Sequence, residues 1–229
     1  MILDTVRYPG EARDYRAYVL RPQVSHTSPG ILLLHDRWGI TPEMEALAAR
    51  LVHAGFVVML PDLYDGRRPE SDDEARQWMY QFSLEKGKEE VRLALSWLRN
   101  QAYTAEHRTA VVGFEHFGTL ALLSTMLSPF TPQAAVVFCA PVGQVIGHVA
   151  QMQAAVQGHF AARDKYVPQG DVDAFRSALE QAGVVHEVYV YEGARHDFMR
   201  PDSKHHHPEA ARQAWERTLA FLRRHLQSP

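Results

Sequence analysis

The chain is poor in cysteine and has no long apolar run. Its only cysteine is Cys139, which excludes an intramolecular disulfide and is compatible with a reducing compartment. No stretch approaches the roughly 18 apolar residues that a membrane-spanning helix needs. Residues 1–20 lack the basic start, apolar core and small-residue cleavage site of a signal peptide. We therefore expect a cytoplasmic protein that does not associate with membranes.

An excess of charge of one sign is also missing. Lys and Arg number 24 against 27 Asp and Glu, which gives a formal net charge of −3. This balance gives no reason to expect a nucleic-acid partner, because such proteins carry a surplus of basic residues. The chain also lacks the glycine-rich loops that cradle the phosphates of nucleotide cofactors, so no cofactor is expected.

Apolar runs alternate with amphipathic stretches along the 229 residues. Residues 30–36 and 56–62 are continuous apolar runs that end in polar residues, as in strands buried on both faces, whereas 4–9 and 13–22 alternate like an exposed antiparallel hairpin. The stretches that indicate the later helices are 83–100, 117–127, 168–182 and 208–226. The order predicts an α/β fold, in which a mostly parallel central sheet carries helices on both faces. No composition shift divides the chain, so residues 1–229 are expected to form a single domain.

Polar residues follow several of the predicted strands, and ligands bind beyond the carboxyl ends of strands in such sheets. Glu115 follows one strand, Asp164 the next but one, and His196 the last. This is the order nucleophile, acid, histidine of α/β-hydrolases. In such a triad the histidine moves the proton, and the acid orients the imidazole and stabilises its charged form.

From about Gly30 onward the chain resembles the dienelactone hydrolase family of the α/β-hydrolase superfamily. The segments that carry the resemblance are "PDLYDGRRPE", "RDKYVP" and "GARHDFMR". The resemblance implies that His196 is the base, Asp164 its orienting acid and Arg200 a residue that binds the substrate carboxylate. It also implies a small ester or lactone as substrate.

The resemblance further assigns the residues around the nucleophile. Asp36 occupies the position of an acidic residue beside the nucleophile, and Trp38 is a candidate lining residue of the substrate cleft. The backbone N–H groups of Arg37 and His116 fall where the family builds its oxyanion hole.

The chain departs from the family at the turn that carries the nucleophile. The family pattern is Gly-x-Cys-x-Gly-Gly, and residues 113–118 read Gly-Phe-Glu-His-Phe-Gly. Aligning Gly113 and Gly118 puts Glu115 at the cysteine position. Phe117 then replaces a glycine, and we expect its bulk to perturb a turn that needs close approach.

Several roles for Glu115 follow from its chemistry. A carboxylate nucleophile is poor against ordinary esters, because it leaves the tetrahedral intermediate more readily than an alkoxide does. Glu115 could instead act as a general base with His196, or bind a metal with Asp36, Asp164 and His196. It could also form an inert salt bridge with His196. The leading hypothesis is an ester or lactone hydrolase, and the alternative is an inactive family member that binds a small carboxylate.

Other conspicuous residues suggest packing or solvation. Cys139 lies in an apolar strand and is expected to be a small core residue. The run 205–207, three histidines, lacks the spacing of a helical zinc pair and is expected to be a solvated loop at the cleft rim. Trp78 is a weaker candidate for the cleft lining. The resemblance also implies a second anion-binding arginine, for which the candidates are Arg67, Arg68 and Arg76.

Overall fold

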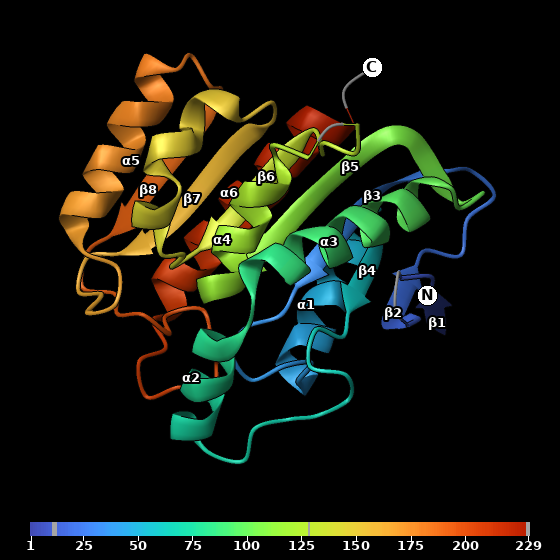
Figure 1. Ribbon diagram of the computed structural model, residues 1–229, viewed down its shortest axis with the longest axis horizontal. Coiled ribbons are helices and arrows are strands. Elements are labelled where there is room, and N and C mark those ends of the chain that lie inside the picture. The colour runs from blue at the N-terminus through green and yellow to red at the C-terminus, as the bar shows by residue number, and fades with distance from the viewer. Residues whose placement is uncertain (11–12, 128, 228–229) are drawn as a thin grey trace.

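The computed structural model describes residues 1–10, 13–127 and 129–227, and its strands form an eight-stranded sheet in the order β1-β2-β4-β3-β5-β6-β7-β8 (Figure 1). The strands are β1 Ile2–Tyr8, β2 Tyr15–Arg21, β3 Ser28–Leu34, β4 Val57–Pro61, β5 Thr104–Phe114, β6 Ala134–Phe138, β7 Ala155–Ala161 and β8 His186–Tyr191. Strands β3 to β8 run parallel, and β1 and β2 are antiparallel to their neighbours. The predicted, mostly parallel sheet is confirmed.

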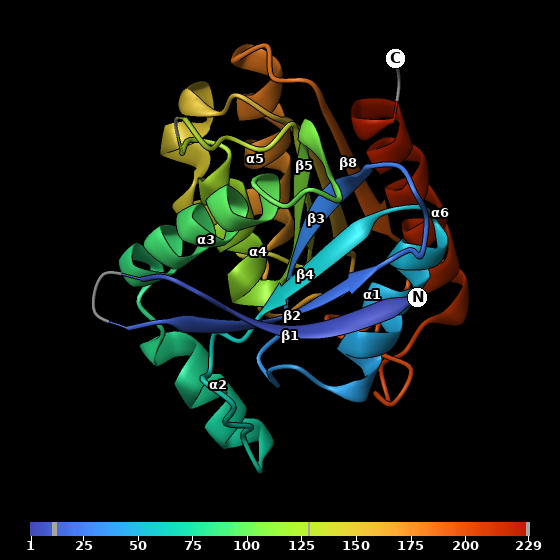
Figure 2. The ribbon, with the colours of Figure 1, turned by 90° about the vertical axis from the view of Figure 1, so that its right-hand side faces the viewer.

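The hairpin of β1 and β2 forms one edge of the sheet, as Figure 2 shows. Its register pairs Ile2 with Arg21 and Tyr8 with Tyr15. Side chains of β1 alternate between half-buried and exposed, because only one face of this edge packs on the protein. The hairpin that the alternating pattern predicts is confirmed.

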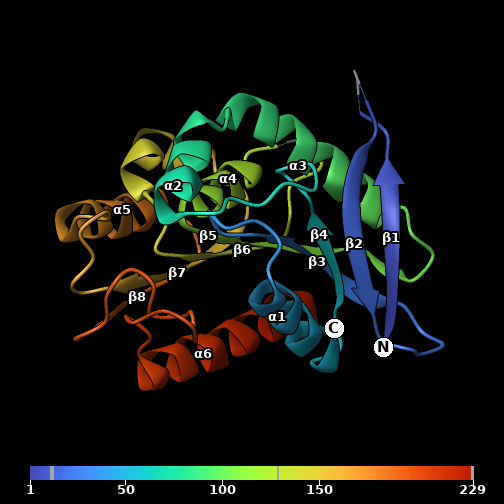
Figure 3. The ribbon, with the colours of Figure 1, turned by 90° about the horizontal axis from the view of Figure 1, so that it is seen from below.

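Helices cover both faces of the sheet (Figure 3). They are α1 Pro42–His53, α2 Asp72–Gln81, α3 Leu84–Arg99, α4 Glu115–Ser124, α5 Gln169–Gln181 and α6 Pro208–Leu226, with short 3-10 turns at Val142–Gln144 and Ile146–Gln151. One apolar core lies between the sheet and α3, α4 and α5, and a second lies between the sheet and α1 and α6. Among the described helices, none is both long and apolar enough to cross a bilayer.

Local sequence explains where the helices begin. The Thr41 side chain accepts a hydrogen bond from Met44 N–H, and Pro42 occupies the first turn of α1. Ser83 caps α3 in the same way, and His207 caps α6 by accepting from Ala210 N–H. The α5 helix has no side-chain cap at Pro168, and α4 has none at Phe114. The α4 helix begins at Glu115, two residues before the predicted start, and its first N–H groups are left for other partners.

A buried acid lies between the edge hairpin and α3. Glu90 is only 6% exposed, and Tyr8 Oη donates a hydrogen bond to its Oε1 over 3.3 Å. Burial raises the pKa of Glu90 to about 7. The folded protein therefore holds a proton on Glu90 at pH values at which the unfolded chain has released it.

We expect the free energy of unfolding to fall as the pH rises from about 4.5 to 7, because the folded state binds the extra proton over that window. Glu90→Gln removes this titration and keeps an acceptor for Tyr8. It should be more stable than the native protein at pH 8, by about 1–3 kcal/mol, and close to it at pH 5. Urea unfolding at both pH values measures this. The exposed Glu180→Gln should show no such difference between the two pH values, and a destabilised Glu90→Gln at pH 8 would contradict the account.

Candidate active site

A tight turn joins β5 to α4 and carries Glu115 at its tip. Glu115 has a φ of 52°, in the left-handed region that favours glycine. Two glycines permit the close crossing of strand and helix. A Cβ on Gly113 would lie 2.5 Å from the Phe117 carbonyl oxygen, and one on Gly118 would lie 2.8 Å from the Ala140 Cβ. A positive φ at a non-glycine residue, as at Glu115, is strained and is typical of functional sites.

Phe117 does not perturb this turn, so that expectation is wrong. Its side chain is fully buried. Its ring lies 4.8 Å from that of His35, 4.9 Å from Phe82 and 5.8 Å from Tyr64, measured between centroids. The missing glycine is tolerated because an aromatic cluster has room for the ring.

The Glu115 carboxylate is buried and held by two cationic side chains. It is 6% exposed. The Arg37 guanidinium forms an ion pair with Oε1, and the Arg37 backbone N–H donates to Oε2 over 3.2 Å. Nε2 of His196 lies 3.4 Å from Oε1. Both carboxylate oxygens therefore have partners.

His196 lies between two carboxylates. Its Nδ1 is 2.7 Å from Asp164 Oδ2, while its Nε2 faces Glu115. Asp164 is fixed in turn, because its Oδ1 accepts from the backbone N–H groups of Tyr166 at 2.8 Å and Val167 at 3.2 Å. The predicted Glu115, Asp164 and His196 thus lie together at the carboxyl edge of the sheet.

The surroundings favour the charged form of His196. Burial alone would lower the pKa of the imidazole, but hydrogen bonds to Asp164, Cys139 and Glu115 outweigh it and raise the pKa above its usual range. The contacts of His196 therefore favour the imidazolium, which can donate a proton.

Arg37 connects three carboxylates. Besides Glu115, its guanidinium lies 3.1 Å from Asp197 and 3.3 Å from Asp72. The sequence predicted a role for its backbone only, and Asp72 and Asp197 were missed. Asp197 directly follows His196, and this adjacency was a usable signal. Asp72 opens α2, and acids are so common in the first turn of a helix that its role could not be recognised.

The two predicted oxyanion donors differ in their surroundings. The Arg37 N–H is occupied by Glu115. The His116 N–H lies in the uncapped first turn of α4, at the positive end of the helix dipole. An oxyanion hole at these two groups stays a prediction.

Asp36, Trp38 and Arg200 form a cluster beside Glu115. Asp36 Oδ1 accepts from the Trp38 N–H over 2.8 Å, and its Oδ2 lies 4.0 Å from Arg200 Nε. The Arg200 guanidinium lies over the Trp38 ring, 5.3 Å from its centroid, and also pairs with Asp202 at 2.6 Å. Burial and the neighbouring Glu115 raise the pKa of Asp36 to about 7.

Cys139 is buried, as expected, but it lies at the site. Ligand atoms of Cys139, Asp164 and His196 lie within 4.8 Å of one another, and so do those of Glu115, His196 and Asp197. Burial raises the pKa of the thiol to about 11, so it is not a thiolate near neutral pH. Either trio could hold a metal only if the cation displaced the proton of His196.

A cleft of about 680 Å³ opens over His196. Trp38, Arg76 and Arg200 line it, as does His205, in line with the predicted rim loop.

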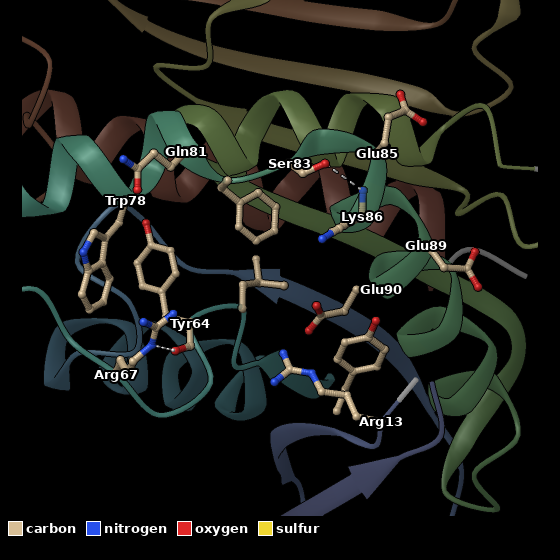
Figure 4. A pocket seen from close by; sticks show the side chains of 13 residues that line it. Arg13, Tyr64, Arg67, Trp78, Gln81, Ser83, Glu85, Lys86, Glu89 and Glu90 are labelled. Atoms are coloured by element: carbon tan, nitrogen blue, oxygen red, sulfur yellow. Dashed lines mark hydrogen bonds between the residues drawn. The ribbon is translucent and has the colours of Figure 1, made fainter. Parts of the chain in front are cut away.

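A second hollow of about 850 Å³ lies on the other side of α2 and contains none of the predicted catalytic residues. Figure 4 shows Arg67, Trp78 and Glu90 in that hollow, with the Arg67 guanidinium 5.0 Å from the Trp78 ring centroid. Trp78 is therefore not part of the cleft lining, and of the arginines in segment 67–76 it is Arg76 that reaches the cleft.

Solved structures share this architecture. A dienelactone hydrolase-like promiscuous phosphotriesterase from metagenomic libraries superposes with a TM-score of 0.86 at 18% identity, covering 98% of each chain. An esterase from Thermogutta terrifontis superposes with a TM-score of 0.71 at 17% identity, covering 97% of this chain and 94% of that one. The fold is that of the α/β-hydrolases.

Sequence comparison identifies the family. The model of the dienelactone hydrolase family matches residues 15–226. A carboxymethylenebutenolidase of Rhodococcus opacus is 29% identical over 210 residues, which cover 86% of this chain and 81% of the relative. A Bradyrhizobium protein named "Probable 2-oxo-3-(5-oxofuran-2-ylidene)propanoate lactonase" is 28% identical over 234 residues, covering 95% and 91%. The chain belongs to the dienelactone hydrolase family.

The pairing of Arg37 with Glu115 predicts strong coupling between the two residues. Arg37→Met leaves buried carboxylates without a cation and should cost about 3–5 kcal/mol of unfolding free energy. Glu115→Gln in the same chain should recover part of that loss, because one of the unpaired charges is gone. Urea unfolding of both single variants and the double variant gives the coupling energy. Strictly additive effects would show that the two side chains do not interact as described.

Proposed function

We propose that the protein hydrolyses a small ester or lactone that has an acidic leaving group and a carboxylate. Membership of the dienelactone hydrolase family supports this, as do two relatives whose names describe lactone hydrolysis. The observation that carries the proposal is the position of His196 between Asp164 and Glu115, with Glu115 at the tip of the nucleophile turn.

In this proposal Glu115 is a general base. It takes a proton from a water molecule, whose oxygen attacks the acyl carbon. The imidazolium of His196 then gives a proton to the departing oxygen as the carbon–oxygen bond breaks. Glu115 passes its proton to the neutral His196 across the 3.4 Å that separates them, and both groups return to their starting charges. The sum is addition of one water to one ester bond.

Protonation of Glu115 also frees an oxyanion donor. In the resting site the Arg37 N–H donates to Glu115. Once that hydrogen bond is released, the same N–H can donate to the developing oxyanion, together with the His116 N–H. The reaction is easiest for a substrate with a good leaving group, because the departing oxygen then needs little help from a proton donor. Enol lactones and aryl esters have such leaving groups, whereas alkyl esters do not.

The cluster of Arg200, Trp38 and Asp36 supports recognition of a carboxylate. Arg200 lies at the cleft beside the reacting groups, where it packs against Trp38 and pairs with the half-exposed Asp202, a partner that a ligand carboxylate can replace. A guanidinium in this setting binds a carboxylate by charge-assisted hydrogen bonds.

A second candidate is a protein that binds a small carboxylate without turnover. The observation in its favour is that Arg37 engages both oxygens of Glu115. A site closed in this way would bind a ligand at Arg200 and leave it unchanged.

Replacement of Glu115 tests the proposed function. Hydrolysis of carboxymethylenebutenolide and 4-nitrophenyl esters is measured in metal-free buffer for the native protein, Glu115→Gln and Glu115→Cys. We expect native turnover and a kcat lower by about 10²–10⁴-fold in Glu115→Gln, because the base is removed. Glu180→Gln, an exposed change of the same kind, should retain native rates.

Two outcomes would contradict the proposal. Activity in Glu115→Cys alone would mean that the scaffold can catalyse hydrolysis but the native site does not. If no variant hydrolyses the substrates and carboxylates raise the Tm of the native protein, the results would favour the binding protein.

The pKa of Asp36 predicts a pH-dependent KM. Below about pH 7 Asp36 is neutral, and above it the anion competes with the substrate carboxylate for Arg200. KM for a carboxylate lactone should therefore rise by about fivefold from pH 6 to pH 8, the equivalent of about 1 kcal/mol for a half-buried pair. Asp36→Asn should make KM flat over this range. A neutral aryl ester is the control, and an equal rise of its KM would contradict the assignment.

A further inference from the structure

The cleft over His196 carries more basic than acidic side chains, although the chain as a whole is slightly acidic. Seven Lys or Arg residues line it, against three Asp. Three of these cations, Arg37, Arg76 and Arg200, have carboxylate partners within the protein. The excess of positive charge in the cleft therefore comes from the remaining four cations.

None of those four cations has a carboxylate partner among the residues that the structure describes. Arg163, Arg195 and Lys204 are exposed and form no ion pair with any residue that the structure describes. The fourth, Lys165, lies over the ring of Tyr166 at 4.9 Å. A group of cations at the mouth of a cleft attracts anionic ligands and is stabilised by them.

The fold holds two of these arginines at the ends of adjacent strands. The Arg163 N–H donates to the Ala194 carbonyl over 2.9 Å, so the loops that follow β7 and β8 are joined at this point. Arg163 immediately precedes Asp164, and Arg195 immediately precedes His196. Their positions are therefore fixed relative to the reacting groups.

The cleft is also larger than one small lactone needs. Its volume of about 680 Å³ is in the range of pockets that hold drug-sized ligands. Arg200 lies against Trp38 and near Asp36, whereas Arg163 and Arg195 stand just after β7 and β8 and Lys204 lies further along the loop that carries Arg200.

We propose that the substrate carries two separate anionic groups, one bound at Arg200 and the other at a rim subsite formed by Arg163, Arg195 and Lys204. This inference rests on the proposed function of the same cleft. The chemistry of the second group is that of a carboxylate or a phosphate, both of which arginine binds through paired N–H donors.

The test compares three 4-nitrophenyl esters whose acyl parts carry no anion, one carboxylate and two carboxylates. KM should be about tenfold lower for the dianionic than for the monoanionic ester. The double variant Arg163→Ala/Arg195→Ala should abolish this ratio, and 0.5 M NaCl should reduce it in the native protein. The control double variant Arg68→Ala/Arg223→Ala removes two exposed arginines outside the cleft and should keep the ratio.

Ligand binding by calorimetry makes the test independent of turnover. The probes are butanoate, glutarate and 4-phosphonobutanoate. Tighter binding of the phosphonate than of glutarate would show that the second anionic group of the substrate is a phosphate. Equal binding of butanoate and both dianions, or equal losses in the rim and control variants, would overturn the rim subsite. One common KM for the monoanionic and dianionic esters, lower than that of the anion-free ester, would overturn the rim subsite while leaving the proposed function intact. Preferential binding of dianions without hydrolysis would retain the subsite and contradict the proposed function.

Discussion

A buried carboxylate must be balanced by cations, and that requirement organises the site around Glu115. Arg37 supplies one cation and His196 the other, and each is fixed by further carboxylates, Asp197 for Arg37 and Asp164 for His196. The network holds His196 in its charged form. The chemistry that we propose for this arrangement is that of an acid and a carboxylate side by side, rather than of a neutral histidine activating a thiol.

The backbone of the turn between β5 and α4 accommodates Glu115 at its tip. Glu115 keeps a positive φ, and Gly113 and Gly118 keep the strand and helix in close contact. The family fold therefore provides a rigid position at the end of β5. The side chain placed there decides which cation it pairs with and which proton transfers can follow.

Patterns of apolar residues predicted the sheet, its edge hairpin and most helices, because burial on one or two faces leaves a direct trace in the sequence. The order of Glu115, Asp164 and His196 predicted that they would meet, since strand ends share one edge of a parallel sheet. The resemblance to a known family supplied the role of Arg200, which periodicity alone could not.

What the sequence did not reveal depends on side-chain contacts between distant segments. Arg37 reaches Asp72 on α2 and Asp197 on the last loop, and no spacing rule connects these positions. Phe117 was expected to disturb the turn, because the room for its ring comes from His35, Tyr64 and Phe82 on other elements. Cys139 is buried as expected, but it lies beside His196 because β6 ends at Phe138 and Cys139 follows at the carboxyl edge of the sheet.

The charge on His196 is the central claim, and nitrogen NMR of the ¹⁵N-labelled imidazole tests it most directly. Both ring nitrogens should show the shifts of an imidazolium from pH 6 to pH 8, and Glu115→Gln should bring the titration closer to neutral pH, because one of the carboxylates that stabilise the charge is removed. A neutral imidazole in the native protein at pH 7 would contradict the account.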